Sequence, residues 1–92
     1  MEKMVILGAG ESGTGAAVLA KIKGLEVFVS DSGEVSDTYK KVLWQHEIDW
    51  EEGRHSEEIV LHAGEVVKSP GIPDSAPIVG KLKERGVKVI SE

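Results

Sequence analysis

The feature that most restricts the fold of this chain is a glycine-rich segment close to its start. An apolar run, Met4–Gly8, leads directly into Gly-Ala-Gly-Glu-Ser-Gly at positions 8–13, and small residues at helical spacing follow. A short run of apolar and β-branched residues indicates a strand that is buried on both faces. Glycines spaced as G-x-G-x-x-G between a strand and a helix are typical of a turn whose backbone N–H groups bind phosphate. A tight turn that binds no ligand is the alternative interpretation.

The rest of the chain repeats this alternation of strand and helix patterns. We expect strands at residues 4–8, 26–31, 48–50, 65–69 and 87–91, and helices at 13–23, 36–46, 56–63 and 75–86. Strands joined by helices of this length form parallel sheets with right-handed crossovers. The sequence therefore predicts an α/β fold, a Rossmann-like open parallel five-stranded sheet of order 3-2-1-4-5 with helices on both faces.

Two expectations concern single side chains of these elements. The first helix carries an apolar stripe that should face the sheet, in which alanines are small enough to allow a close approach. Its members are Ala16, Ala17, Leu19, Ala20 and Ile22. Lys68, at the end of the fourth strand, is expected to be a solvated strand residue.

Length and composition limit the classes of protein to which the chain can belong. Its 92 residues predict a single domain, residues 1–92. The net charge of −5 comes from interspersed acids and bases, which argues against nucleic acid or an anionic membrane as a partner. No apolar stretch approaches the roughly 18 residues of a membrane span. The sequence contains no cysteine, which excludes thiol chemistry and fits a cytoplasmic location.

The glycine loop lacks the residues of an ATP-hydrolysing site. It contains no lysine or arginine, so a phosphate would be held by backbone N–H groups and the Ser12 hydroxyl, with the Glu11 side chain turned outward. No G-x-x-x-x-G-K-[ST] motif occurs, because Gly80-Lys81 is followed by Leu82. We therefore predict no catalytic residue, no metal site and no cofactor site in this chain.

Two further segments are expected at the same edge of the sheet. Asp31 ends the second strand, where an acid can accept hydrogen bonds from a ribose or from the N3–H of a uracil, with Ser32 beside it; capping of a turn is the alternative. The segment Ser69-Pro-Gly-Ile-Pro73 follows the fourth strand and would face the glycine loop across the topological switch point. Its prolines stiffen the loop, and Gly71 would let the backbone approach a sugar. Arg54 and His55 would lie near this edge and could supply an ancillary contact.

Together these motifs resemble the N-terminal UDP-binding domain of the Mur ligases, and most closely the members that add D-glutamate. The resemblance covers essentially the whole chain: G-x-G-x-[ST]-G, the strand ending in Asp, the S-P-G-[IV] loop and the closing V-I-S-E strand. It implies one domain of a larger three-domain cytoplasmic enzyme that acts in peptidoglycan precursor synthesis. The implied substrate is UDP-N-acetylmuramoyl-L-alanine, with ATP, magnesium and D-glutamate bound by the other domains.

The resemblance also implies a set of ligand contacts, position by position. The diphosphate would meet Gly10, Glu11, Ser12 and Gly13; the uracil would meet Asp31 and Ser32; the sugar side would be lined by Ser69, Pro70 and Gly71. Relatives can carry a basic residue shortly after the strand-two Asp, whereas Gly33 stands here, so backbone of residues 33–35 would have to cover the uracil. A stand-alone NAD-binding regulatory domain is the alternative function.

Overall fold

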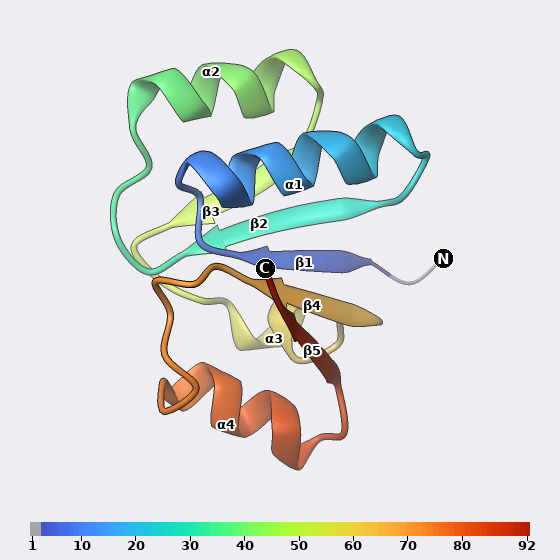
Figure 1. Ribbon diagram of the computed structural model, residues 1–92, viewed down its shortest axis with the longest axis vertical. Coiled ribbons are helices and arrows are strands. Elements are labelled where there is room, and N and C mark those ends of the chain that lie inside the picture. Colours follow the sequence, from blue (N-terminus) through green and yellow to red (C-terminus); the bar gives the residue numbers. More distant parts are fainter. Residues whose placement is uncertain (1–2) are drawn as a thin grey trace.

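The computed structural model describes residues 3–92, which form one five-stranded parallel sheet with helices on both faces (Figure 1). The strand order is β3-β2-β1-β4-β5, which confirms the predicted fold class and order. The strands are β1 (Met4–Leu7), β2 (Val27–Asp31), β3 (Asp49–Glu52), β4 (Glu65–Lys68) and β5 (Lys88–Ser91). The helices are α1 (Glu11–Ile22), α2 (Asp37–Gln45), α3 (Glu57–Val60) and α4 (Pro77–Glu84).

Each face of the sheet has its own hydrophobic core. Helices α1 and α2 cover one face, and α3 and α4 cover the other (Figure 1). Strand β1 contributes to both cores because successive side chains of a strand point to opposite faces: Ile6 packs on the α1–α2 side, and Val5 and Leu7 on the α3–α4 side. The first core also holds Ala17, Ala20, Val29 and Leu43, and the second holds Phe28, Val60, Val66, Val79 and Leu82.

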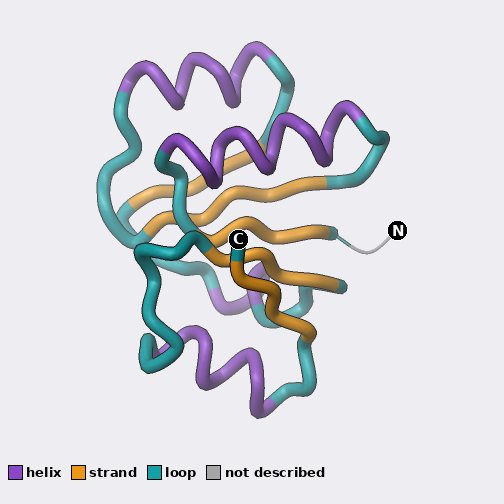
Figure 2. The backbone as a smooth tube through the Cα atoms, in the orientation of Figure 1, coloured by secondary structure: helices purple, strands orange, loops and turns teal. Residues whose placement is uncertain are grey.

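The parallel register brings the carboxyl ends of the strands to one edge of the sheet. Leu7 is in register with both Ser30 and Lys68, and Asp31 is in register with Glu52. The loops that follow β1, β2, β3 and β4 therefore gather at this edge, as Figure 2 shows. In open α/β sheets, ligands bind at such an edge, where neighbouring strands lead to opposite faces. Here that point lies between β1 and β4.

Some boundaries differ from the sequence-based expectation. Helix α1 begins at Glu11 rather than Gly13, because Gly10 serves as the N-cap residue without a side-chain cap. Helix α4 begins at Pro77 rather than near Ser75, in keeping with the fit of proline to a first helical turn, whose N–H groups need no helical partner. Strand β3 lies slightly later than expected, at Asp49–Glu52.

The apolar stripe predicted for α1 is only partly correct. Its buried residues are Gly13, Thr14, Ala17 and Ala20, whose spacing places small side chains against the sheet. Leu19 and Ile22 are 55% and 71% exposed, so they lie to the side of the contact instead of within it. Within residues 3–92, no helix combines the length and apolar character that a membrane crossing requires.

The close approach of α1 to the end of β1 yields a test with a matched pair of glycines. A Cβ atom at Gly13 would lie 1.9 Å from the Gly8 carbonyl oxygen, whereas a Cβ at Gly15, on the same helix, would meet nothing within 4 Å. We expect Gly13→Ala to lower the free energy of unfolding by about 1–3 kcal/mol through overpacking. Gly15→Ala should raise it by about 0.5–1 kcal/mol, since alanine is the better helix former.

Urea unfolding followed by circular dichroism measures both changes. Equal effects of the two substitutions would contradict the close contact at Gly13.

Candidate functional site

The glycine loop makes a sharp turn at Gly8 and is locked to its neighbours there. Gly8 has φ +101°, a conformation that L side chains rarely adopt, and its N–H donates to the Ser30 carbonyl at 2.9 Å. A Cβ at Gly8 would lie 2.8 Å from the Ser69 Cβ. The glycine loop and the loop after β4 therefore touch, as the switch-point interpretation predicts.

Gly10 differs from these structurally required glycines. Its φ of −80° and ψ of −163° suit any residue, and a Cβ there would meet nothing within 4 Å. The fold of residues 3–92 therefore gives no reason for a glycine at this position. A ligand that approaches the backbone closely would supply one.

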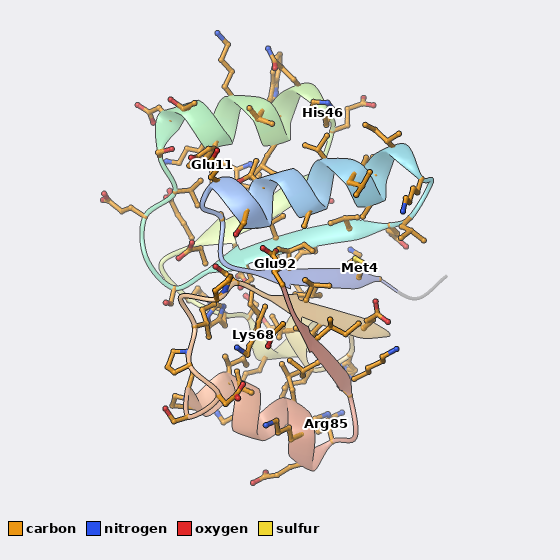
Figure 3. The ribbon with its side chains drawn as sticks, viewed as in Figure 1. Met4, Glu11, His46, Lys68, Arg85 and Glu92 are labelled. Atoms are coloured by element: carbon orange, nitrogen blue, oxygen red, sulfur yellow. The ribbon has the colours of Figure 1, made fainter. Side chains whose placement is uncertain are left out.

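The start of α1 next to Gly10 offers N–H groups for such a ligand. The first N–H groups of a helix have no partner within the helix, and no hydrogen bond from Glu11, Ser12 or Gly13 N–H to another part of residues 3–92 is present. The helix dipole favours an anion at this end. Glu11, labelled at the start of α1 in Figure 3, is exposed, so its carboxylate lies outside the packed loop.

Asp31 fixes the glycine loop to the end of β2. Its Oδ2 accepts the Ala9 N–H and its Oδ1 accepts the Gly33 N–H, both at 2.8 Å. Part of its acceptor capacity is therefore used within the fold, although a carboxylate has about four lone-pair positions. The turn-capping interpretation of Asp31 is thus realised in the structure, and it leaves room for a ligand hydrogen bond.

The loop after β2 is held by its backbone and by Glu52. The Gly33 carbonyl accepts the Gly53 N–H, and the Val35 N–H donates to Glu52 Oε1, both at 2.9 Å. The Val35 N–H and the Lys40 ammonium, 2.9 Å from Glu52 Oε2, hold the pKa of Glu52 below its ordinary value. Residues 33–35 therefore form an ordered loop directly after β2.

The expectation that Lys68 is solvated is wrong. Lys68 is 6% exposed, and its Nζ donates to the Ile72 carbonyl at 2.9 Å and lies 3.4 Å from Asp74 Oδ1. Alternation along β4 puts it on the same face as Val66, on the side of α4 (Figure 3). The buried ammonium thereby holds the loop that begins at Ser69, whose N–H donates to the Leu7 carbonyl at 2.9 Å.

A cavity of about 430 Å³ opens beside these loops, on the α3–α4 side. Ser32 and Gly71 line it from the loops after β2 and β4, and His55 lines it from the loop after β3. Ile72, Pro73, Ala76, Pro77 and Ile78 make much of the remaining wall apolar, and Glu57 and Lys81, which form an ion pair, complete it. A flat, mostly apolar ring with a few polar edges fits such a lining.

His55, which lines the cavity, belongs to a hydrogen-bonded polar cluster with Ser30, Glu51 and Ser56. Ser30 Oγ lies 2.8 Å from Glu51 Oε2 and 2.7 Å from His55 Nδ1, while Ser56 donates to Glu51 through its N–H at 2.7 Å and its hydroxyl at 2.5 Å. Partial burial alone would raise the pKa of Glu51, but the hydrogen bonds from Ser56 and Ser30 keep that pKa below its ordinary value. Burial lowers the pKa of His55, although the Glu51 and Asp31 carboxylates oppose this shift.

The structure thus gathers the predicted residues at one edge, over two adjoining parts. Gly10, Glu11, Ser12 and Gly13 form the helix end, and Ser32 and Gly71 line the cavity. Asp31 ends β2, and Ser69 and Pro70 lie in the loop after β4. Sequence reasoning missed Lys68 and the cluster of Ser30 and Glu51. The alternation of β4, which places Lys68 on the same face as Val66, is the sequence signal for its position.

Comparison with known sequences gives a consistent match. The family described as "Mur ligase MurD-like, N-terminal domain" matches residues 2–91. The chain is 62% identical over all 92 residues to a protein of Bacteroides thetaiotaomicron named UDP-N-acetylmuramoylalanine--D-glutamate ligase. A protein of the same name from Christiangramia forsetii is 55% identical over 91 residues. The chain spans about a fifth of the length of these relatives, 21% and 20% respectively.

Two solved structures share the fold. A pseudomurein peptide ligase type C from Methanothermus fervidus superposes with a TM-score of 0.85 at 22% identity, over 99% of this chain and 19% of the other. UDP-N-acetylmuramate:L-alanyl-gamma-D-glutamyl-meso-diaminopimelate ligase from Neisseria meningitides gives 0.82 at 25% identity, over 99% and 28%. In each of these larger chains, the matching part is a minor share of the whole.

The hydrogen bonds to Glu51 predict a loss of stability in acid. Because its folded pKa lies below the ordinary 4.5, its ionised form stabilises the fold above pH 4.5, and this contribution disappears as pH falls through the folded pKa. We expect Glu51→Gln to lower the free energy of unfolding by about 1 kcal/mol at neutral pH. The difference from the parent should shrink as pH falls below 4.5 and through the folded pKa of Glu51.

Urea unfolding at several pH values measures this difference. Glu58→Gln is the control, since Glu58 is exposed and, among residues 3–92, pairs with the exposed Arg54 alone. A Glu51→Gln deficit that stays constant with pH would contradict the account.

Proposed function

The chain belongs to the family of MurD-like N-terminal domains of the Mur ligases, and we propose that it binds the UDP end of UDP-N-acetylmuramoyl-L-alanine. The proposal takes its substrate from the relatives, which are named UDP-N-acetylmuramoylalanine--D-glutamate ligase. One observation carries it: the fold of residues 3–92 does not require a glycine at position 10, yet Gly10 stands there, next to the unpaired N–H groups at the start of α1. A cavity lined by Ser32 and Gly71 opens at the same edge of the sheet.

The diphosphate would lie over the start of α1. The N–H groups of Glu11, Ser12 and Gly13 would donate to its oxygens, and the Ser12 hydroxyl would add one more donor. The open space above Gly10 supports this placement, because a side chain there would point toward the anion. No lysine or arginine occurs at positions 8–13, so the backbone is the main source of binding energy.

The uracil would lie between the loops after β2 and β4. Asp31 and Ser32 would flank it on one side and Gly71 on the other, with Ser69 and Pro70 toward the sugar. The backbone of residues 33–35, which is held by hydrogen bonds to Glu52 and Gly53, would cover the base where relatives can carry a basic residue.

We propose that the whole protein is a cytoplasmic ligase of peptidoglycan precursor synthesis. ATP with magnesium would activate the substrate carboxylate as an acyl phosphate, which the amine of D-glutamate attacks. The residues of this chain do not fit an ATP site, since Gly80-Lys81-Leu82 lies within α4 and no P-loop motif occurs. The part played by residues 1–92 would be to anchor the substrate, and the chain alone should release no phosphate.

A stand-alone NAD-binding regulatory domain is the second candidate, because the glycine loop and Asp31 also suit a dinucleotide. The two functions differ in ligand preference. UDP should bind this chain with a dissociation constant between about micromolar and millimolar, given its size. NAD should bind more weakly.

The first test removes the open space above the helix end. Gly10→Val places a branched side chain where the diphosphate would approach, while the ordinary φ of Gly10 leaves the fold intact. We expect UDP affinity to fall at least about tenfold, or roughly 1.4 kcal/mol, by isothermal titration calorimetry. Gly80→Val, at a glycine of α4 that also has open space around it, is the control and should bind normally. Unchanged UDP affinity in Gly10→Val would mean that the loop is only a turn.

The second test concerns Asp31. Asp31→Ala removes the acceptor for the Ala9 and Gly33 N–H groups as well as any hydrogen bond to the ligand. UDP affinity should fall by about 1–3 kcal/mol, the cost of leaving polar groups unpaired. Calorimetry with UDP and NAD on parent and variant separates the two functions. Tighter binding of NAD than of UDP, with that preference lost in Asp31→Ala, would contradict the UDP proposal.

A further inference from the structure

The hydrogen bonds beneath the cavity determine which nitrogen of His55 carries its proton. Ser30 Oγ lies within hydrogen-bond distance of Glu51 Oε2 and of His55 Nδ1. The hydroxyl has one proton, and an ionised carboxylate can only accept. Ser30 therefore donates to Glu51 and accepts from His55, which requires an Nδ1–H on the imidazole.

Two alternatives to this proton arrangement are weaker. Glu51 receives three hydrogen bonds, from the Ser56 N–H, the Ser56 hydroxyl and Ser30, and these hold its pKa low, so it does not supply the proton. The Arg54 carbonyl is 3.4 Å from Ser30 Oγ, long for an O–H···O hydrogen bond, and it cannot compete with Glu51 at 2.8 Å.

The other ring nitrogen of His55 is consequently a free acceptor. A neutral imidazole with Nδ1–H has its lone pair on Nε2. Within residues 3–92, Nε2 makes no hydrogen bond, and it is not among buried polar atoms lacking a partner, so it is reached by solvent. His55 is half-buried and lines the cavity together with Ser32 and Gly71.

We propose that His55 Nε2 accepts the N3–H of the uracil ring and thereby selects uracil over cytosine. This inference rests on the proposed function, which puts the base between Ser32 and Gly71. Uracil has a single ring N–H donor, whereas cytosine presents a lone pair at the same position, which would face the lone pair of Nε2. A site built to accept a hydrogen bond rejects an analogue that lacks the donor.

Asp31 is the other acceptor near Ser32, and both of its oxygens already hold backbone of the fold. Each of them accepts a backbone N–H, from Ala9 and from Gly33. Asp31 also does not line the cavity, whereas His55 does. Asp31 therefore holds the glycine loop beside the nucleotide and keeps lone pairs for a further ligand hydrogen bond, whereas His55 Nε2 accepts from the base.

The charges around His55 set the pH range of this selection. The groups that face it are Glu51 on β3, Asp31 on β2, Glu57 on α3 and Lys81 on α4. Burial keeps the pKa of His55 below 6.5 despite the two nearest carboxylates, so the ring is neutral at pH 7. Protonation in acid turns Nε2 into a donor, which removes the preference for uracil and favours the N3 of cytosine.

The test compares UDP with CDP, because both carry the same sugar and diphosphate. In the parent chain, UDP should bind about tenfold more tightly than CDP at neutral pH. His55→Phe keeps a flat ring without an acceptor and should bring the ratio close to one. His55→Gln can present an amide oxygen near the Nε2 position and should restore much of the preference. His62→Phe, at an exposed histidine of the same segment, should keep the parent ratio.

Two measurements on the unaltered chain keep the proposal independent of variant folding. The ratio of UDP to CDP affinity should fall as pH is lowered from about 8 through the folded pKa of His55, which lies below 6.5, while titration of the diphosphates cancels in the ratio. The ¹⁵N spectrum of the imidazole should show Nδ1–H and an unprotonated Nε2 at neutral pH.

The outcomes distinguish this inference from the proposed function. If UDP binds while His55→Phe leaves the UDP/CDP ratio unchanged, or if the imidazole carries its proton on Nε2, the role of His55 is wrong and UDP binding stands. If UDP does not bind the parent chain, both proposals fail.

Discussion

The structure depends on the close contact between the end of β1 and the start of α1. Gly13 leaves room for the Gly8 carbonyl at a distance where any side chain would collide. This contact sets the first turn of α1 directly above the carboxyl edge of the sheet, with its N–H groups unpaired. The positive φ of Gly8 also allows Ser69 to pack against the same turn, so one pair of glycines brings the helix end and the loop after β4 together.

Charged residues at the ends of the strands hold the loops around this contact. Asp31, at the end of β2, binds the backbone of residues 9 and 33; Glu52, at the end of β3, binds that of Val35; Lys68, at the end of β4, binds that of Ile72. Each of these charged side chains fixes the backbone of a neighbouring loop. Loops that are fixed in this way form a preorganised site, which reduces the entropy lost when a ligand binds.

The sequence predicted the sheet and its order because alternating apolar runs and amphipathic segments leave few topologies. It also placed the glycine loop and the loop after β4 at one edge, since the parallel pairing of β1 and β4 requires it.

The sequence did not predict the burial of Lys68, because a lysine is buried only when a specific acceptor, here the Ile72 carbonyl, is in place. The sequence also predicts burial of Leu19 and Ile22, which are exposed. Hydrophobicity alone does not reveal that α1 contacts the sheet through its small residues, Gly13, Thr14, Ala17 and Ala20. The tautomer of His55 follows only from distances in three dimensions.

The proposed site requires that one ligand spans the end of α1 and the loops after β2 and β4. A titration of ¹⁵N-labelled chain with UDP and with inorganic pyrophosphate, followed by amide chemical shifts, measures whether it does. Pyrophosphate should shift the amides of Glu11, Ser12 and Gly13 alone. UDP should shift these and also Ser32 and Gly71, because the base reaches the second part of the site. If UDP shifts no amides beyond those that pyrophosphate shifts, the two parts do not form one nucleotide site and the account is contradicted.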